Sequence, residues 1–106
     1  MRKHLFAAVL SLVFALTFVV TQAAGPSLVA DAAERGDLAA VQSLLTKSTD
    51  VNAAQPDGMT ALHWAARNGD VELAQMLLYA GANVKATTRL GGYSPLMMAA
   101  EQGNAD

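Results

Sequence analysis

The chain repeats itself at a spacing of about 33 residues. Residues 32–45 (AAERGDLAAVQSLL) match residues 65–78 (AARNGDVELAQMLL) at a shift of 33, and both stretches share Gly-Asp and Leu-Leu pairs. A second shift, of 34, places residues 92–104 over residues 58–70. A fixed period of this length indicates stacked supersecondary units, each of which buries its apolar face against its neighbours.

Each unit is predicted to fold as a helix, a turn, a second helix and a loop. The first helices are expected to begin after side chains that can accept a hydrogen bond from a free N–H of the first turn: Ser27, Thr60 and Ser94. Pro95 then takes the first helical position, where its missing N–H costs nothing. Glycine is typical of helix ends, so the first helices are expected to end at Gly36, Gly69 and Gly103.

The second helices are predicted to open at Asp37 and Asp70, next to the positive end of the helix dipole. In the middle unit, Leu73, Met76 and Leu77 recur at i, i+3 and i+4 and form one apolar stripe. Gly81 is expected to end this helix, and Gly91-Gly92 marks a turn in the loop that follows. The fold class predicted from this pattern is all-α.

The middle unit resembles the ankyrin repeat. The resemblance depends on Gly58, the run Thr60-Ala61-Leu62-His63, Ala65-Ala66, Gly69, Leu77-Leu78 and Gly81-Ala82-Asn83-Val84, and the flanking units add Asp50-Val51-Asn52-Ala53 and Ser94-Pro95-Leu96. It covers residues 27–106 and implies a solenoid of about two and a half repeats, with units at 27–55, 56–89 and 90–106. The residues that the resemblance assigns to structure are Thr60, Leu62, His63, Gly69, Gly81, Ser94 and Pro95.

The outer units depart from the middle one. The first unit has Ala30 and Asp31 where the middle unit has His63 and Trp64, as suits a terminal repeat with one side in water. The third unit stops at Asp106, where its second helix should begin, although Leu96, Met97 and Ala99 are expected to pack back onto the middle unit. Such arrays need about three repeats for stability. We therefore expect the chain to be a fragment of a longer product, and the mass of the native protein would test this.

The N-terminus reads as a secretory signal peptide. A basic start, Arg2-Lys3, precedes an apolar run over residues 5–20 and small residues up to Ala23, after which cleavage is expected. The alternative is a retained membrane anchor, but the run is shorter than the ~20 apolar residues of a spanning helix. Removing residues 1–23 leaves five Lys and Arg against nine Asp and Glu, a net charge of 5 − 9 = −4. This acidic balance argues against nucleic-acid binding.

The sequence gives no support for catalysis, a metal site or a cofactor site. There is no cysteine, and His63 is the only histidine besides His4, which lies in the predicted leader. A catalytic base needs a partner within hydrogen-bond reach, and a zinc site needs several ligands. The resemblance implies that His63 bonds within and between adjacent units and that Trp64 packs between helices. Gly91-Gly92 lacks the lysine of a phosphate-binding loop.

What remains is a surface for binding another protein, because stacked repeats align their loop tips and first helices into one face. The resemblance places its variable residues at these positions, with Met59, Leu90 and Tyr93 as candidate exposed anchors that could instead pack under a neighbouring loop. The full candidate set is Glu34, Arg35, Pro56, Asp57, Met59, Arg67, Asn68, Leu90, Tyr93, Glu101 and Gln102.

The predicted function is therefore an exported adaptor, protector or inhibitor of an unidentified protein partner. Because ankyrin-repeat proteins of most organisms are intracellular, the resemblance together with a signal peptide implies a bacterial protein in the periplasm or beyond. Two alternatives remain open. The repeats could form the N-terminal part of a longer enzyme or transport-associated protein. Alternatively, residues 5–20 could anchor a scaffold in the membrane. The downstream reading frame and the N-terminus of the mature product distinguish them.

Overall fold

A computed structural model describes residues 26–105 and shows five helices and no strand among them. The helices are α2 (Leu28–Glu34), α3 (Leu38–Thr46), α4 (Ala61–Asn68), α5 (Val71–Tyr79) and α6 (Pro95–Ala105). None of these helices is long and apolar enough to cross a bilayer. The predicted signal peptide, residues 1–23, lies outside the described residues.

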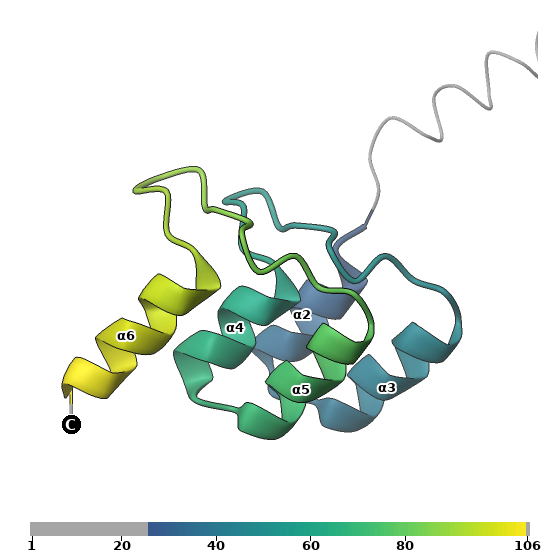
Figure 1. Ribbon diagram of the computed structural model, residues 1–106. Helices are drawn as coiled ribbons and strands as arrows, with labels where there is room; N and C mark the ends of the chain where they lie inside the picture. Colours follow the sequence, from purple (N-terminus) through teal and green to yellow (C-terminus); the bar gives the residue numbers. More distant parts are fainter. Residues whose placement is uncertain (1–25, 106) are drawn as a thin grey trace, which may run out of the picture.

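The helices form two layers (Figure 1). The inner row consists of α2, α4 and α6, and α4 packs on both of its neighbours. In the outer row, α3 packs on α2 and α5 packs on α4, so each pair is one helix-turn-helix unit. The two long connections, residues 47–60 and 80–94, run together along one side of the stack. The all-α repeat architecture predicted from the 33-residue period is thus confirmed.

Short polar side chains begin the helices. The carboxylate of Asp37 accepts the Ala40 N–H at 3.0 Å, and that of Asp70 accepts the Leu73 N–H at 3.0 Å. The Ser94 hydroxyl accepts the Met97 N–H at 3.2 Å, directly before the turn that starts with Pro95. The first helix begins directly after Ser27 as predicted, but the expected capping bond is absent: the Ser27 hydroxyl instead donates to the Asp31 carboxylate at 3.2 Å.

The third inner helix ends differently from the first two. Gly36 and Gly69 adopt left-handed backbone (φ 69° and 66°) within two residues of the ends of α2 and α4, and the chain turns there into the outer helix. Gly103 does not do this, and the prediction that it ends its helix was wrong, because α6 continues through it to Ala105. The third unit therefore has no helical turn equivalent to the other two within residues 26–105.

The core lies between the two layers. Val29, Val41, Leu73 and Leu77 are fully buried, and they belong to one apolar cluster with the small residues of α2 and α4. Each such aliphatic side chain contributes about 1.5–3 kcal/mol by leaving water. The predicted stripe on α5 faces this core, with Met76 half-buried beside it.

The packing of the third unit differs from the expectation. Pro95 and Met98 are its buried residues, whereas Leu96, Met97 and Ala99 are exposed. The predicted packing of these last three onto the middle unit was therefore wrong. A helix presents only one face to its neighbour, and α6 turns the side with Pro95 and Met98 toward α4.

Hydrogen bonds to main-chain groups tie the two long loops to each other. The side-chain amide of Asn52 donates to the Gly81 carbonyl at 3.3 Å, and its Oδ1 accepts the Asn83 N–H at 2.7 Å. Further along, the Arg89 N–H donates to the Asp57 carbonyl at 2.9 Å. These bonds hold the loop tips in fixed register above the inner helices.

Candidate functional site

His63 is fully buried at the start of α4, and its ring joins two units. Nδ1 accepts the Thr60 N–H at 3.1 Å and lies 2.8 Å from the Thr60 hydroxyl, while Nε2 lies 2.8 Å from the Tyr93 carbonyl of the next unit. A backbone N–H can only donate and a carbonyl can only accept, so the proton resides on Nε2. Both ring nitrogens are therefore occupied by structural bonds.

His63 and Thr60 together cap the start of α4. Thr60 is the cap of α4, with its hydroxyl accepting the His63 N–H at 3.4 Å, and it completes a reciprocal capping box. Among residues 26–105, no group of three or more His, Cys, Asp or Glu side chains is arranged to hold a metal ion. His63 is a structural link between the second inner helix and the second long loop.

A recess between the loop tips and the inner helices gathers most of the candidate binding residues. It is lined by Asp57 from the first long loop, Arg67 from α4, Leu90 and Tyr93 from the second long loop, and Glu101 and Gln102 from α6. Leu90 is 87% exposed and Tyr93 is 40% exposed. Apolar and charged side chains thus lie side by side on an open surface, which we call the tip face.

The tip face continues toward the first unit. There Glu34, Pro56 and Asp57 meet Asp31, Gln55 and Trp64 around a second recess. Asp31, Trp64 and Met98 were not among the residues predicted for this surface. Each precedes a predicted face residue by three positions on its helix, so helical periodicity could have found them.

Trp64 is held at the centre of the tip face. Its indole N–H donates to the Gln55 side chain at 2.9 Å, and the Gln55 amide nitrogen donates to Asp31 at 2.9 Å and to Glu34 at 2.8 Å. The Arg67 guanidinium lies over the indole, 5.5 Å from the ring centroid, within the range of a cation–π contact. This network orients side chains from two units before any partner arrives.

Three candidate residues are placed differently from the rest. Met59 is a correction: it lines the first recess, but only 4% of it is exposed, so it cannot act as an exposed anchor. Arg35 and Asn68 are exposed at the ends of α2 and α4 but line neither recess. Their positions place them at the margin of the face.

Thr88 is a further residue that the sequence analysis missed. Its N–H donates to the Tyr93 carbonyl at 2.9 Å, its hydroxyl donates to the Leu90 carbonyl at 2.9 Å, and the same hydroxyl accepts the Tyr93 N–H at 3.0 Å. These three bonds close the loop that presents Leu90 and Tyr93. The spacing Thr-x-x-x-x-Tyr does not by itself predict these three hydrogen bonds, because they depend on the conformation of the loop.

The comparisons with known proteins agree with this architecture. A sequence profile described as "Ankyrin repeats (3 copies)" matches residues 29–106. The chain belongs to the ankyrin-repeat family, and its repeats define a protein–protein interaction module.

Individual relatives share the repeats at moderate identity. The chain is 36% identical over 80 residues to the human Notch-regulated ankyrin repeat-containing protein, covering 72% of this chain and 69% of that protein. It is also 36% identical over 75 residues to the rice potassium channel AKT1, covering 71% of this chain but 8% of the channel. A match to the fission-yeast palmitoyltransferase akr1 is 45% identical over 56 residues, covering 52% of this chain and 9% of that protein.

Proposed function

We propose that the protein is an exported binding module that captures one protein partner on the tip face and performs no chemistry of its own. The observation that carries this proposal is the gathering of Leu90, Tyr93, Arg67 and Trp64 on one surface from separate units. Tyrosine, tryptophan and arginine are the residues that most often dominate binding energy at protein interfaces. The partner could be localised, shielded or inhibited by this contact.

The rigidity of the tip face supports a binding role. Thr88 closes the loop around Leu90 and Tyr93, and Gln55 fixes the indole of Trp64. Side chains that are already ordered lose less conformational entropy on binding, so more of the contact energy becomes affinity.

Charge is unevenly distributed along the tip face. Asp31, Glu34 and Asp57 line the recess near the first unit, and no lysine or arginine lines it with them. Toward the third unit, Arg67 shares the other recess with Glu101. We expect the partner to place a cationic segment against the first unit, and electrostatic complementarity of this kind raises association rates at low salt.

Site-specific photo-crosslinking tests the proposed face. A photoreactive residue in place of Leu90, which is 87% exposed, should yield one discrete adduct with a partner protein in the cells that make this chain. The matched control is the same residue in place of Tyr79, which is 94% exposed but lies on the outer helix α5. An adduct from position 79 and none from position 90 would place the binding surface elsewhere.

We further propose export through a cleaved signal peptide. The basic start, the apolar run over residues 5–20 and the small residues before Ala24 support this. N-terminal sequencing of the mature product should give a start at Ala24 or Gly25. A mature chain that still begins at Met1 and sediments with membranes would instead establish the anchored scaffold.

A second candidate function follows from how small a part of its larger relatives the chain matches. The chain spans only 8% of a potassium channel and 9% of a palmitoyltransferase, so the same repeats occur as small parts of much larger proteins. In that case the module would serve an enzyme or transport-associated protein whose active domain lies elsewhere. The downstream reading frame decides between the two: further repeats favour the adaptor, and a domain with catalytic motifs favours the larger protein.

A further inference from the structure

The two recesses of the tip face occupy equivalent places in consecutive units. We call the one near the first unit the Trp64 recess and the other the Leu90 recess, and their volumes are about 460 and 450 Å³. The repeat register relates four positions of the Trp64 recess to four of the Leu90 recess: Glu34, Gln55, Asp57 and Trp64 to Arg67, Thr88, Leu90 and Met98. The same recess therefore recurs along the row of inner helices.

The loop above each recess is closed by the same main-chain bond. The Gln55 N–H donates to the Met59 carbonyl at 2.9 Å, and one unit later the Thr88 N–H donates to the Tyr93 carbonyl at 2.9 Å. A segment that crosses both recesses thus meets the same backbone frame twice, with different side chains on it.

The side chains at the equivalent positions differ in charge. Glu34 has Arg67 as its counterpart, and Asp57 has the apolar Leu90. Three carboxylates line the Trp64 recess, with Asp31 as the third, and no lysine or arginine lines it with them. The lining of the Leu90 recess includes two methionines and a tyrosine. The first recess therefore suits a cation, and the second suits an apolar side chain.

The indole of Trp64 favours a guanidinium as this cation. The Arg67 guanidinium already lies over the ring, 5.5 Å from its centroid, but Arg67 lines only the neighbouring recess. The Gln55 amide donates to the carboxylates of Asp31 and Glu34, and each carboxylate keeps further lone pairs that can accept. A second planar guanidinium can stack on the indole and bond to a carboxylate in two places, whereas the ammonium of a lysine cannot.

The spacing of the recesses sets the spacing of the side chains that fill them. The inner helix α4 packs on both α2 and α6, and the axes of packed helices lie about 8–10 Å apart. A polyproline II segment has three residues per turn and a rise of about 3.1 Å, so side chains at i and i+3 lie on one side of it, roughly 9 Å apart. The two distances match.

We propose that the tip face binds an extended protein segment in the polyproline II conformation. An arginine of this segment occupies the Trp64 recess, and a leucine, methionine or phenylalanine three residues away occupies the Leu90 recess. The inference rests on the binding function proposed above and adds the chemistry of the partner. Charge complementarity fixes which of the two anchors lies nearer the first unit.

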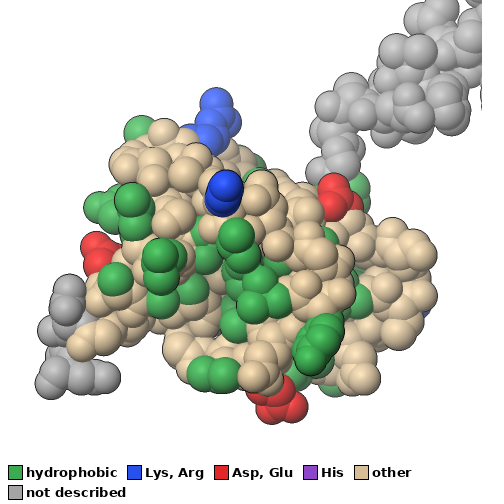
Figure 2. Space-filling model, viewed as in Figure 1, with side chains coloured by type: hydrophobic (Ala, Val, Ile, Leu, Met, Phe, Trp, Pro, Cys, Tyr) green, Lys and Arg blue, Asp and Glu red, His purple; other side chains and the backbone are tan. Residues whose placement is uncertain are grey.

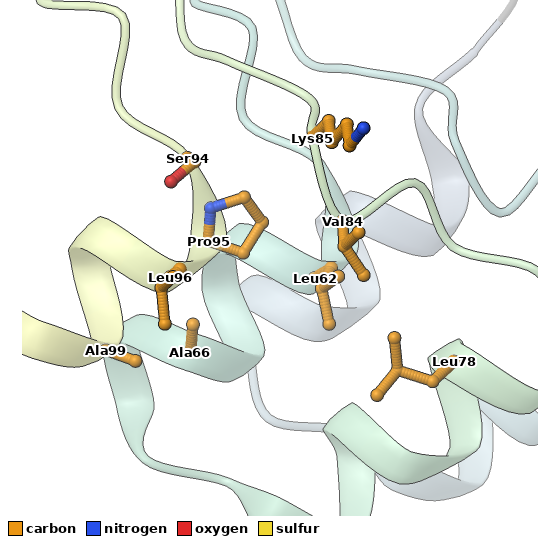
Figure 3. Close-up of a pocket in the computed structure, with 9 residues that line it drawn as sticks. All are labelled: Leu62, Ala66, Leu78, Val84, Lys85, Ser94, Pro95, Leu96 and Ala99. Atoms are coloured by element: carbon orange, nitrogen blue, oxygen red, sulfur yellow. The ribbon is translucent and has the colours of Figure 1, made fainter.

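A third cavity, the groove beside α6, has different chemistry (Figure 3). Leucine, valine and alanine side chains line it, and Lys85 is the charged residue of its lining. On the face drawn in Figure 2, hydrophobic side chains gather at the centre and acidic ones lie at the margins. The groove shares no residue with the two recesses, so Leu96 in its wall is a control position for binding that depends only on apolar contact.

A random nine-residue peptide library displayed on phage, selected on the purified protein, tests the proposal. The enriched peptides should share an arginine and a large apolar residue three positions apart. Binding of a synthetic, tryptophan-free copy is followed by the fluorescence of Trp64, the only tryptophan of the chain. Replacing the arginine of this peptide by alanine should weaken binding about tenfold and remove most of the fluorescence change.

Three variants of the protein assign each anchor to its recess. Glu34→Lys should abolish the preference for arginine and keep that for the apolar residue, whereas Leu90→Asp should do the reverse. Leu96→Asp, in the groove beside α6, should leave both preferences unchanged. All three positions are exposed, so the helical circular dichroism of the variants should match that of the unchanged protein.

Enriched peptides without an arginine, or without a fixed spacing, would overturn the proposal. Loss of binding in Leu96→Asp would do so as well, because it would place the peptide in the groove. These failures are distinct from failure of the tip-face function, which is measured by crosslinking from position 90 in cells. A cellular adduct without the peptide motif would keep the binding function and reject the arginine-bearing segment.

Discussion

Replacing His63 by alanine is expected to lower the free energy of unfolding by about 3–5 kcal/mol. The change removes a fully buried ring, leaves the Thr60 N–H without its partner and cuts the bond to the Tyr93 carbonyl. A stack of this size has a total stability of only about 4–12 kcal/mol, so this loss is a large fraction of it and the variant should unfold at a clearly lower urea concentration. Urea denaturation followed by circular dichroism measures the loss.

His63→Gln is the graded control for this prediction. A glutamine side chain can keep one of the two links but cannot reach Thr60 and Tyr93 together, so an intermediate loss of stability is expected. If both variants unfold at the same urea concentration as the unchanged protein, the link between the units does not depend on this ring.

Replacing Gly58 by alanine is expected to cost about 2–4 kcal/mol, the second largest effect. Gly58 has a φ of +88°, and an added Cβ would lie 2.9 Å from the Arg89 nitrogen and 3.0 Å from the Thr88 Cα. Both contacts are with backbone atoms that cannot rotate away. The two long loops would have to separate, which would break the bond from the Arg89 N–H to the Asp57 carbonyl.

Gly81 offers a control with nearly the same backbone conformation. Its φ is +91°, but an added Cβ would meet nothing within 4 Å. Gly81→Ala should therefore cost only the left-handed strain, about 1–2 kcal/mol. The difference between the two variants in urea denaturation measures the close approach of the loops, and equal losses would show that this approach contributes nothing.

The repeat register made most of the architecture predictable. Identical spacing forces equivalent residues into equivalent places, so the order of the helices, the caps at Thr60, Asp70 and Ser94, and the stripe on α5 could be expected before the structure was known. The errors fall in the outer units. Ser27 and Gly103 have the register of their middle-unit counterparts, but within residues 26–105 the inner helix of each outer unit packs on only one other inner helix, whereas α4 packs on two.

The tip face was only partly predictable, for a different reason. The repeat register identifies which positions lie near a loop tip, and this was enough to predict that Asp57, Arg67 and Leu90 share one face. It does not say which way a tip residue turns. Met59 turns inward and is buried, and Thr88 folds its loop through bonds that depend on conformation rather than on spacing.

The loops are fastened by main-chain atoms, by the side-chain amide of Asn52, by the left-handed Gly58 and by the buried His63. The side chains at the outermost tips, including those of Pro56 and Leu90, are exposed and carry little of the folding energy. Substitutions at these tips can therefore accumulate one at a time without lowering the stability enough to unfold the chain. A lineage built on this plan can acquire a new partner while its scaffold stays the same.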